Sequence, residues 1–269
     1  MNSIRASSSG PVTVRIVMRM LAMVIALLAT TTAARAAEIN AFVSTAIKAV
    51  TDVLLPPFEH ANGHVIRASY APSGALLPRF ERGEPVDVFL TDSAAIDALI
   101  RQGKIAGGRI DLARTGVGIA VRKGATRPDV SSPEALRRAL MAAKSVGYAA
   151  PSGGSITAAH IIGVFERLGI AAEVAPKARL AAGGPNGRVS VLVSSGQAEI
   201  GLQQVSELMS NPEVEVIGML PPELQQTTIY SAGVTTSARE ADAARAMIKV
   251  LTAPSAAPVW KAKGLDPAW

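Results

Sequence analysis

Residues 69–92 read SYAPSGALLPRFERGEPVDVFLTD and combine two different local signals. Ser73 belongs to a small polar turn at the start of a helical pattern that extends over residues 74–82. A continuous apolar run follows at residues 86–90, as expected for a strand that is buried on both faces of a parallel sheet. Asp92 then stands where it can cap the next helix. The stretch predicts helix, buried strand and helix in succession, with a hydroxyl at a helix start where an anion could be held.

The alternation of strand and helix patterns continues along the chain. Further strands are predicted at residues 38–43, 65–70, 117–121, 145–149 and 200–203. Helical patterns separate them, which predicts an α/β fold with mostly parallel sheets. One segment is ambiguous, because RVSVLVSSG at residues 188–196 alternates apolar and polar residues and by itself favours a strand.

Two local signals concern helix ends. The helical pattern that starts near Ile47 is expected to break at Pro56-Pro57, since proline lacks the N–H that continues a helix. Ser237 and Glu240 stand at the spacing of a capping box, which predicts a helix from there to Leu251.

The first 36 residues have the design of a secretory signal peptide. Arg5, Arg15 and Arg19 precede an apolar run at residues 20–29, and small residues follow up to Ala36. The apolar run is short for a membrane span, although an uncleaved anchor is an alternative. We expect residues 1–36 to be removed and the mature protein to be exported to the periplasm.

The charge of the chain depends strongly on this segment. Four of the 27 basic residues and none of the 21 acidic residues lie in it, which leaves 23 basic against 21 acidic residues. A nucleic-acid-binding protein would need a basic stripe with aromatic residues, and neither is present. No nucleic-acid partner is therefore predicted.

The sequence offers few groups for catalysis or metal binding. It has no cysteine and three histidines. His60 and His64 have the spacing of zinc ligands on a helix, but Asn62-Gly63 lies between them and is typical of a turn. His160 has no identifiable partner, and the patterns of a nucleophile elbow and of a dinucleotide-binding loop are both absent. We predict no enzyme activity, no metal and no cofactor.

Small polar loops instead recur just before helices. They are Ser44-Thr45, Pro72-Ser73-Gly74, residues 153–157 and residues 183–187. Helix starts present unpaired N–H groups with a partial positive charge, and parallel sheets bind ligands at the carboxyl ends of their strands. Since the loops lack Lys and Arg, apart from Arg188 after the last one, the pattern predicts an anion site built mainly from neutral donors.

The chain resembles a known family, the molybdate-binding proteins that serve as periplasmic receptors of ABC importers. The opening stretch resembles that family's segment S-G-x-L-x-x-x-I-x-x-G-x-P-x-D-x-F-x-S-A-D. SITAAHIIGVFERLGI, LVSSGQAEIGLQQVSEL and APVWKAKGLDP resemble its later segments, in the family's order. The resemblance covers nearly all of residues 38–269.

The resemblance implies a two-lobed type II periplasmic binding protein fold, each lobe a mostly parallel sheet flanked by helices. Lobe 1 would comprise residues 37–116 and 232–269, and lobe 2 residues 117–231. The chain would cross between them near residues 115–117 and 229–233. RVSVLVSSG would then be a helix, contrary to its local pattern.

The resemblance also implies the ligand contacts. They would come from Ser44, Thr45, Ser73, Gly74, Ser155, Thr157, Asn186 and Gln204. The chain departs from the family at two or three of the contacts, and Thr157 stands roughly where the family has a small residue. Ala46 stands nearest to the family's ligand serine, and Gln204 stands where the family has a tyrosine. The ligand is accordingly expected to be molybdate, another oxyanion or a small carboxylate.

The resulting hypothesis is a monomeric periplasmic binding protein that captures a small anion and delivers it to an ABC permease. Two alternatives remain. One is a sensory or scaffold protein of the same fold, and the other is a hydrolase that uses His160 with Ser155.

Overall fold

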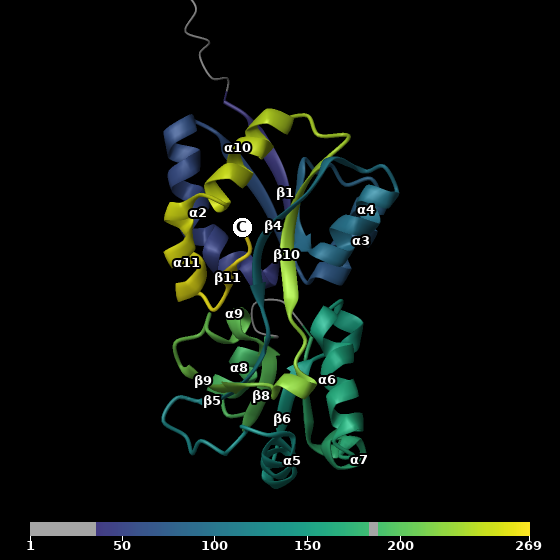
Figure 1. The fold of residues 1–269 in the computed structure, drawn as a ribbon, viewed down its shortest axis with the longest axis vertical. Coiled ribbons are helices and arrows are strands. Elements are labelled where there is room, and N and C mark those ends of the chain that lie inside the picture. Colours follow the sequence, from purple (N-terminus) through teal and green to yellow (C-terminus); the bar gives the residue numbers. More distant parts are fainter. Residues whose placement is uncertain (1–35, 183–187) are drawn as a thin grey trace, which may run out of the picture. The chain divides into compact units, whose positions relative to one another are not determined.

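Six strands form the larger of two sheets, in the order β11-β4-β10-β3-β1-β2 (Figure 1). Strand β1 pairs in parallel with β2 and β3, whereas β10 is antiparallel to β3 and β4. The strand bounds are β1 Glu38–Ser44, β2 Val65–Ala71, β3 Val88–Asp92, β4 Ile105–Thr115, β10 Thr228–Thr235 and β11 Asp266–Pro267.

The computed structural model describes residues 36–182 and 188–269, and Ala37–Trp269 forms one structural unit by itself. Residues 1–35, which include all but the last residue of the predicted signal peptide, lie outside the described residues. The loop at residues 183–187 also lies outside them. None of the helices in the described part of the chain is long and apolar enough to span a bilayer.

Helices cover both faces of the larger sheet. The covering helices are α2 Lys48–Asn62, α10 Ala241–Leu251 and α11 Ala257–Ala262 on one face, and α3 Ser73–Glu81 and α4 Ser93–Arg101 on the other. Val88 and Leu90 pack toward the first set of helices, and Phe89 packs toward the second. The prediction of a strand buried on both faces is confirmed, and burying a side chain such as Phe89 contributes about 1.5–3 kcal/mol.

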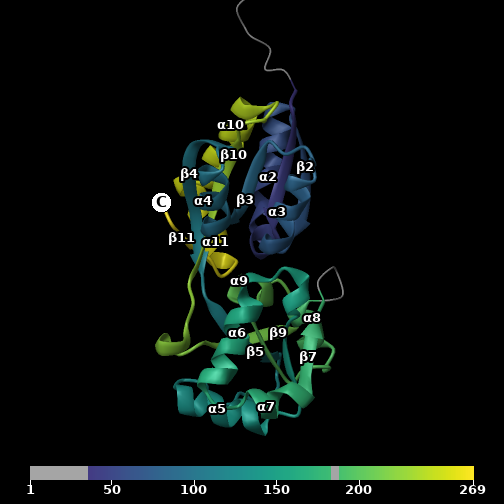
Figure 2. The ribbon, with the colours of Figure 1, turned by 90° about the vertical axis from the view of Figure 1, so that its right-hand side faces the viewer.

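Five strands form the smaller sheet, in the order β7-β6-β8-β5-β9 (Figure 2). Their bounds are β5 Val117–Arg122, β6 Val146–Ala149, β7 Ala178–Ala181, β8 Ile200–Gln204 and β9 Val214–Met219. The helices on one face are α5 Pro133–Ala142, α6 Ile156–Arg167 and α7 Ala171–Val174, and those on the other are α8 Val189–Ser194 and α9 Val205–Leu208. Short 3₁₀ turns complete the chain at Thr45–Ile47, Pro151–Gly153, Ala175–Lys177, Pro222–Leu224 and Pro254–Ala256.

The chain passes between the two sheets twice. The first passage is at Gly116, between β4 and β5, as the resemblance implied. The second precedes Thr228, because the whole of β10 pairs with β3 and β4 in the larger sheet. The expected crossing at residues 229–233 is therefore misplaced by a few residues, and residues 228–231 belong to the larger sheet.

Four local expectations have clear outcomes. RVSVLVSSG contains helix α8, as the resemblance implied and against its alternating pattern. Its Val189 and Val193 side chains pack over Gly201 of β8, so tertiary contacts decide the conformation. Asp92 caps α4 as predicted, accepting a hydrogen bond from the Ala95 N–H at 3.0 Å.

Helix α2 continues through Pro56 and Pro57, so the expected break is wrong. The two carbonyls that lose their N–H partners belong to Asp52 and Val53, and both residues are exposed to water.

The expected capping box at Ser237 is also wrong, since α10 begins after Glu240 without a side-chain cap of its own. Buried Asp87 instead accepts hydrogen bonds from the N–H groups of Arg239 at 2.6 Å and Glu240 at 3.2 Å.

Candidate functional site

A cavity of about 630 Å³ lies where strands of both sheets end. Ser44 ends β1, Ala71 ends β2, Ala149 ends β6 and Gln204 ends β8, and all four residues line it. Ligands of parallel α/β folds bind at such carboxyl ends. The cavity is the candidate binding site.

Two buried serines form the part of the cavity that the opening stretch supplies. The Ser73 hydroxyl donates a hydrogen bond to Ser44 Oγ at 3.1 Å, and Ser44 Oγ also accepts from the Ala46 N–H at 3.4 Å. Both serine residues are at most 3 % exposed. The structure thus brings together two hydroxyls that lie 29 positions apart in the sequence.

A second group of polar side chains comes from β8, α9 and β10. The Tyr230 hydroxyl donates to Gln204 Oε1 at 2.5 Å, and among the described residues Gln204 Nε2 has no hydrogen-bond partner. Ser206 Oγ is likewise buried and without a partner. A buried donor left unsatisfied costs about 1–3 kcal/mol. Two such atoms beside one cavity indicate that a ligand completes their hydrogen bonding.

The start of helix α6 provides a third group. Thr157 Oγ1 donates to Gln203 Oε1 at 2.7 Å and lies 3.0 Å from Ser155 Oγ. Both hydroxyl residues line the cavity, as does Gln203. Helix starts favour negative charge, so this side of the cavity is suited to an anion.

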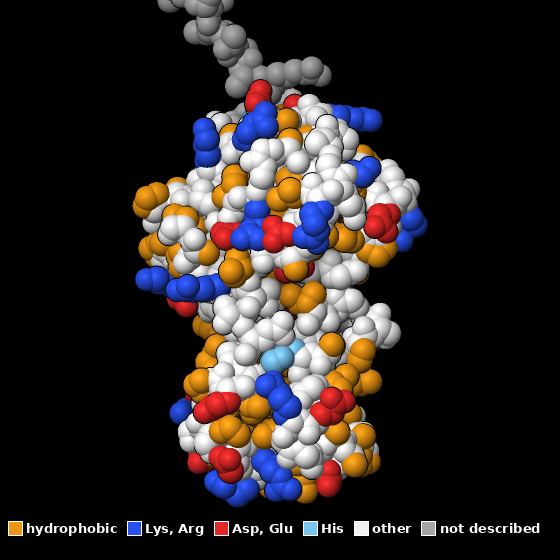
Figure 3. Space-filling view, turned by 45° about the vertical axis from the view of Figure 1, so that its right-hand side comes forward, with side chains coloured by type: hydrophobic (Ala, Val, Ile, Leu, Met, Phe, Trp, Pro, Cys, Tyr) orange, Lys and Arg blue, Asp and Glu red, His pale blue; other side chains and the backbone are white. Residues whose placement is uncertain are grey.

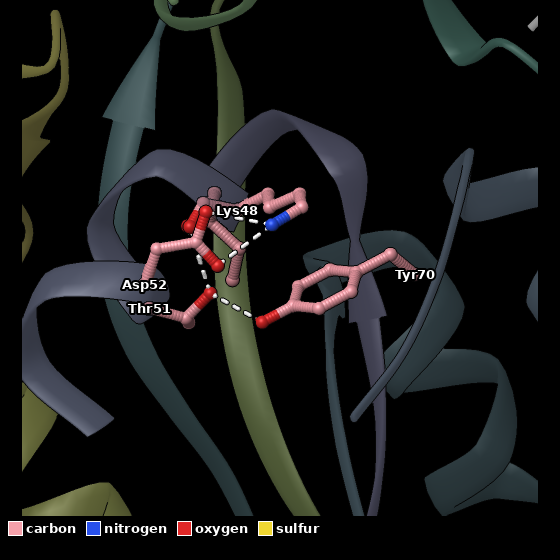
Figure 4. A network of polar contacts seen from close by, with 5 residues as sticks. Lys48, Thr51, Asp52 and Tyr70 are labelled. Carbon is pink, nitrogen blue, oxygen red and sulfur yellow. Dashed lines mark hydrogen bonds and ion pairs between the residues drawn. The ribbon is translucent and has the colours of Figure 1, made fainter. Parts of the chain in front are cut away.

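Charged side chains also line the cavity, beside the neutral donors that the sequence predicts. Lys48 Nζ lies 2.7 and 2.6 Å from the two Asp52 oxygens and 4.5 Å from the centre of the Tyr70 ring (Figure 4). The Tyr70 hydroxyl is 3.1 Å from Thr51 Oγ1, and burial raises the pKa of Tyr70. On the outer face drawn in Figure 3, basic and acidic side chains are interspersed.

Arg188 and Glu207 complete the charged lining. Arg188 is exposed, whereas Glu207 is only partly accessible and its Oε1 accepts a hydrogen bond from Thr45 Oγ1 at 3.0 Å. Burial raises the pKa of Glu207, while the Thr45 hydrogen bond and the charge of Arg188 lower it by less. Burial and the nearby Glu207 carboxyl raise the pKa of Tyr230 well above its ordinary value.

The eight residues expected to contact a ligand have different positions. Six of them line the cavity, namely Ser44, Thr45, Ser73, Ser155, Thr157 and Gln204. Gly74 does not line it. The Gly74 N–H donates to the carbonyl of Gly154 at 3.0 Å, so Gly74 forms a contact between two loops. Asn186 lies outside the described residues.

Sequence reasoning missed Tyr230, Glu207 and Lys48, which all line the cavity. Glu207 stands four residues after the predicted strand at residues 200–203, and this position was the available signal. Tyr230 had none, because only the return of β10 beside β3 brings it to the site.

The histidines have other surroundings. His160 Nε2 lies 2.8 Å from the Leu224 carbonyl, and burial lowers the pKa of His160. The ring therefore faces a backbone carbonyl, and Ser155 pairs with Thr157, so the pairing required for the hydrolase alternative is not formed. Among the described residues, no three His, Asp or Glu side chains are grouped to hold a metal ion.

Comparison with known proteins adds independent information. A sequence model described as bacterial extracellular solute-binding protein matches residues 39–266. An aconitate isomerase of Pseudomonas sp is 34 % identical over 218 residues, covering 79 % of this chain and 81 % of the relative. The molybdate-binding protein ModA of Azotobacter vinelandii is 28 % identical over 236 residues, covering 86 % of this chain and 91 % of the relative.

The fold is also that of solved structures. The periplasmic molybdate-binding protein of Azotobacter vinelandii superposes with a TM-score of 0.66 at 18 % identity, covering 84 % of this chain and 98 % of the other. The expected two-lobed type II fold is confirmed, and so is the likeness to molybdate-binding proteins. The sheets are mixed, however, and not mostly parallel as expected, because β10, β11, β5 and β9 all pair antiparallel to their neighbours. The chain belongs to the bacterial extracellular solute-binding protein family.

Proposed function

We propose that the protein captures a small organic polycarboxylate in the cavity between its two sheets. The observation that carries the proposal is the pair of buried, unpartnered atoms Gln204 Nε2 and Ser206 Oγ beside an anion-suited cavity. Both can donate hydrogen bonds to carboxylate oxygens. The hydroxyls of Ser44 and Ser73 are paired with each other in this structure and would become further donors by rotating toward the ligand.

The size of the cavity favours an organic anion over a tetrahedral oxyanion. Four oxygens the size of water, at roughly 30 Å³ each, occupy only about 120 Å³. The cavity of about 630 Å³ is several times larger and falls in the usual range for small organic ligands. Arg188 would add positive charge for a ligand that carries more than one carboxylate.

One of the two relatives supports this choice. One relative is named for aconitate, a tricarboxylate, and another for molybdate. The replacement of the molybdate family's tyrosine by Gln204 also favours a different anion. We take trans-aconitate as the probe for the proposed class.

Capture would proceed by closure of the two sheet-bearing lobes about the passages at Gly116 and before Thr228, as a monomer. Delivery to an ABC permease would follow. Mass spectrometry of ligand released from protein purified without denaturation tests the proposal. A di- or tricarboxylate supports it, whereas molybdate or sulfate as the released ligand contradicts it.

A second function, isomerisation of a polycarboxylate, is favoured by the Glu207 carboxyl in the cavity and by the 34 % identical relative. In aconitate, a base would remove a proton from the CH₂ carbon. The double bond would shift by one position, and the proton would return to the former alkene carbon. Proton NMR of cis-aconitate in D₂O with the protein detects this chemistry as deuterium incorporation and a trans product. Unchanged spectra at high protein concentration would exclude it and leave capture alone.

A further inference from the structure

Glu207 is an acidic side chain in a cavity that is otherwise suited to anions. Glu207 lies three positions after Gln204 in the sequence, and its side chain lines the cavity together with Ser206. The hydrogen bond from Thr45 Oγ1 at 3.0 Å engages Oε1. Within the described residues, no Lys, Arg or His nitrogen lies within ion-pair distance of the Glu207 carboxyl.

The charged neighbours of Glu207 come from several elements. Arg188 precedes α8 and is exposed, and its positive charge favours the ionised form of Glu207. Tyr230 on β10 is neutral, because burial and Glu207 itself raise its pKa. On α2, Lys48 is held by Asp52, so the pair adds little net charge.

An anionic ligand changes the balance between the protonated and the ionised form of the Glu207 carboxyl. Two negative groups that share one water-poor space repel each other, and the usual result is that one of them takes up a proton. A protonated carboxyl has an O–H that can donate a short hydrogen bond to a carboxylate. Uptake of one proton therefore converts a repulsive contact into an attractive one.

We propose that Glu207 holds the ligand as a neutral carboxylic acid, so that capture of a polycarboxylate is coupled to uptake of one proton by this side chain. The proposal rests on the capture function given above. The proton comes from solvent and binds Glu207 Oε2, the oxygen that Thr45 does not engage. When the ligand leaves, the same proton returns to solvent.

The direction of the pH dependence follows from linkage. Burial already raises the pKa of Glu207 in the empty site, and a neighbouring anion raises that pKa further. Affinity then increases as the pH falls from the higher pKa of the complex to the lower pKa of the empty site. The steepest possible change is about tenfold per pH unit for one proton.

Titration calorimetry with trans-aconitate measures this coupling directly. Titrations in buffers with different ionisation heats give the number of protons taken up, and a series from about pH 6 to about pH 9 gives the affinity change. The probe stays ionised over this range, since carboxylic acids have ordinary pKa values near 4. We expect wild-type protein to take up as much as one proton and to bind up to about tenfold more weakly per unit of rising pH.

The variant Glu207→Gln separates this role from a structural one. Its amide is always neutral and still donates a hydrogen bond, so we expect binding without proton uptake and with little pH dependence. Glu173→Gln is the matched control, because Glu173 is exposed on α7 and outside the cavity. It should keep the wild-type proton count.

The outcomes are distinct. Binding by wild-type protein without proton uptake overturns the inference and leaves the proposed function intact. Equal uptake by wild type and Glu207→Gln also overturns it, because another group would then carry the proton. If wild-type protein shows no binding heat with trans-aconitate or citrate, the proposed function fails and the inference fails with it. If Glu207→Gln does not fold, binding by wild-type protein without proton uptake still overturns the inference.

Discussion

The Tyr230 hydroxyl lies 2.5 Å from Gln204 Oε1 and fixes the amide, so that the other end of Gln204 remains without a partner. Tyr230→Phe would remove the orienting donor and let the amide rotate. We expect an affinity loss of roughly twofold to tenfold, consistent with a neutral hydrogen bond worth about 0.5–1.5 kcal/mol. Titration calorimetry with trans-aconitate measures it. Tyr148→Phe is the control, since Tyr148 packs against Phe165 in the core of the smaller sheet.

Ser73→Ala would remove a buried hydroxyl from the wall of the cavity. The loss should cost about 1.5–3 kcal/mol, the range for a hydrogen bond to a charged group. This corresponds to roughly tenfold or more in affinity. Arg188→Ala should have a smaller effect that fades with added salt, because Arg188 is exposed. A larger loss for Arg188→Ala than for Ser73→Ala would show that charge, and not neutral donors, dominates binding.

Gly74→Ala should hinder closure of the cavity. A Cβ atom at Gly74 would lie 2.8 Å from the carbonyl oxygen of Gly154, which is too close for the loop contact to form. We expect weaker binding and a smaller ligand-induced decrease in radius of gyration by small-angle scattering, with little change in melting temperature. Gly163→Ala is the control, because a Cβ there meets no atom within 4 Å in helix α6. A ligand-induced decrease in radius of gyration as large in Gly74→Ala as in wild-type protein would contradict this account of closure.

Thermal unfolding should report the raised pKa of Glu207 without any ligand. The folded protein holds this proton to higher pH than the unfolded chain does, because burial raises the pKa. Stability contributed by the proton is complete below the ordinary carboxyl pKa and is lost as the pH rises through the raised value. We expect Glu207→Gln to flatten the fall in melting temperature over that window. A wild-type melting temperature that rises with pH throughout this pH range would contradict a raised pKa of Glu207.

The sequence predicted the fold well because its main signals are local or belong to a family pattern. The buried strand after Ser73 and the Asp92 cap depend on a few neighbouring residues, and both form as expected. Helix α8 required the family resemblance, because the contacts of Val189 and Val193 with Gly201 override the local pattern.

The binding site was less predictable, since its side chains converge through the topology. Tyr230 reaches Gln204 only because β10 returns between β3 and β4. The same holds for the Asp87 carboxylate, which receives the N–H groups before α10 from more than 150 positions away. Such pairings have no signature in either segment taken alone.

Titration of ligand-stripped protein with trans-aconitate and with molybdate tests the central claim most directly. Unfolding and refolding removes any ligand retained during purification, so the two anions are compared on equal terms. The polycarboxylate cavity predicts a dissociation constant of about 1 μM or tighter for trans-aconitate, near −8 kcal/mol. It also predicts that molybdate binds at least about tenfold more weakly. Tighter binding of molybdate than of trans-aconitate would contradict the claim.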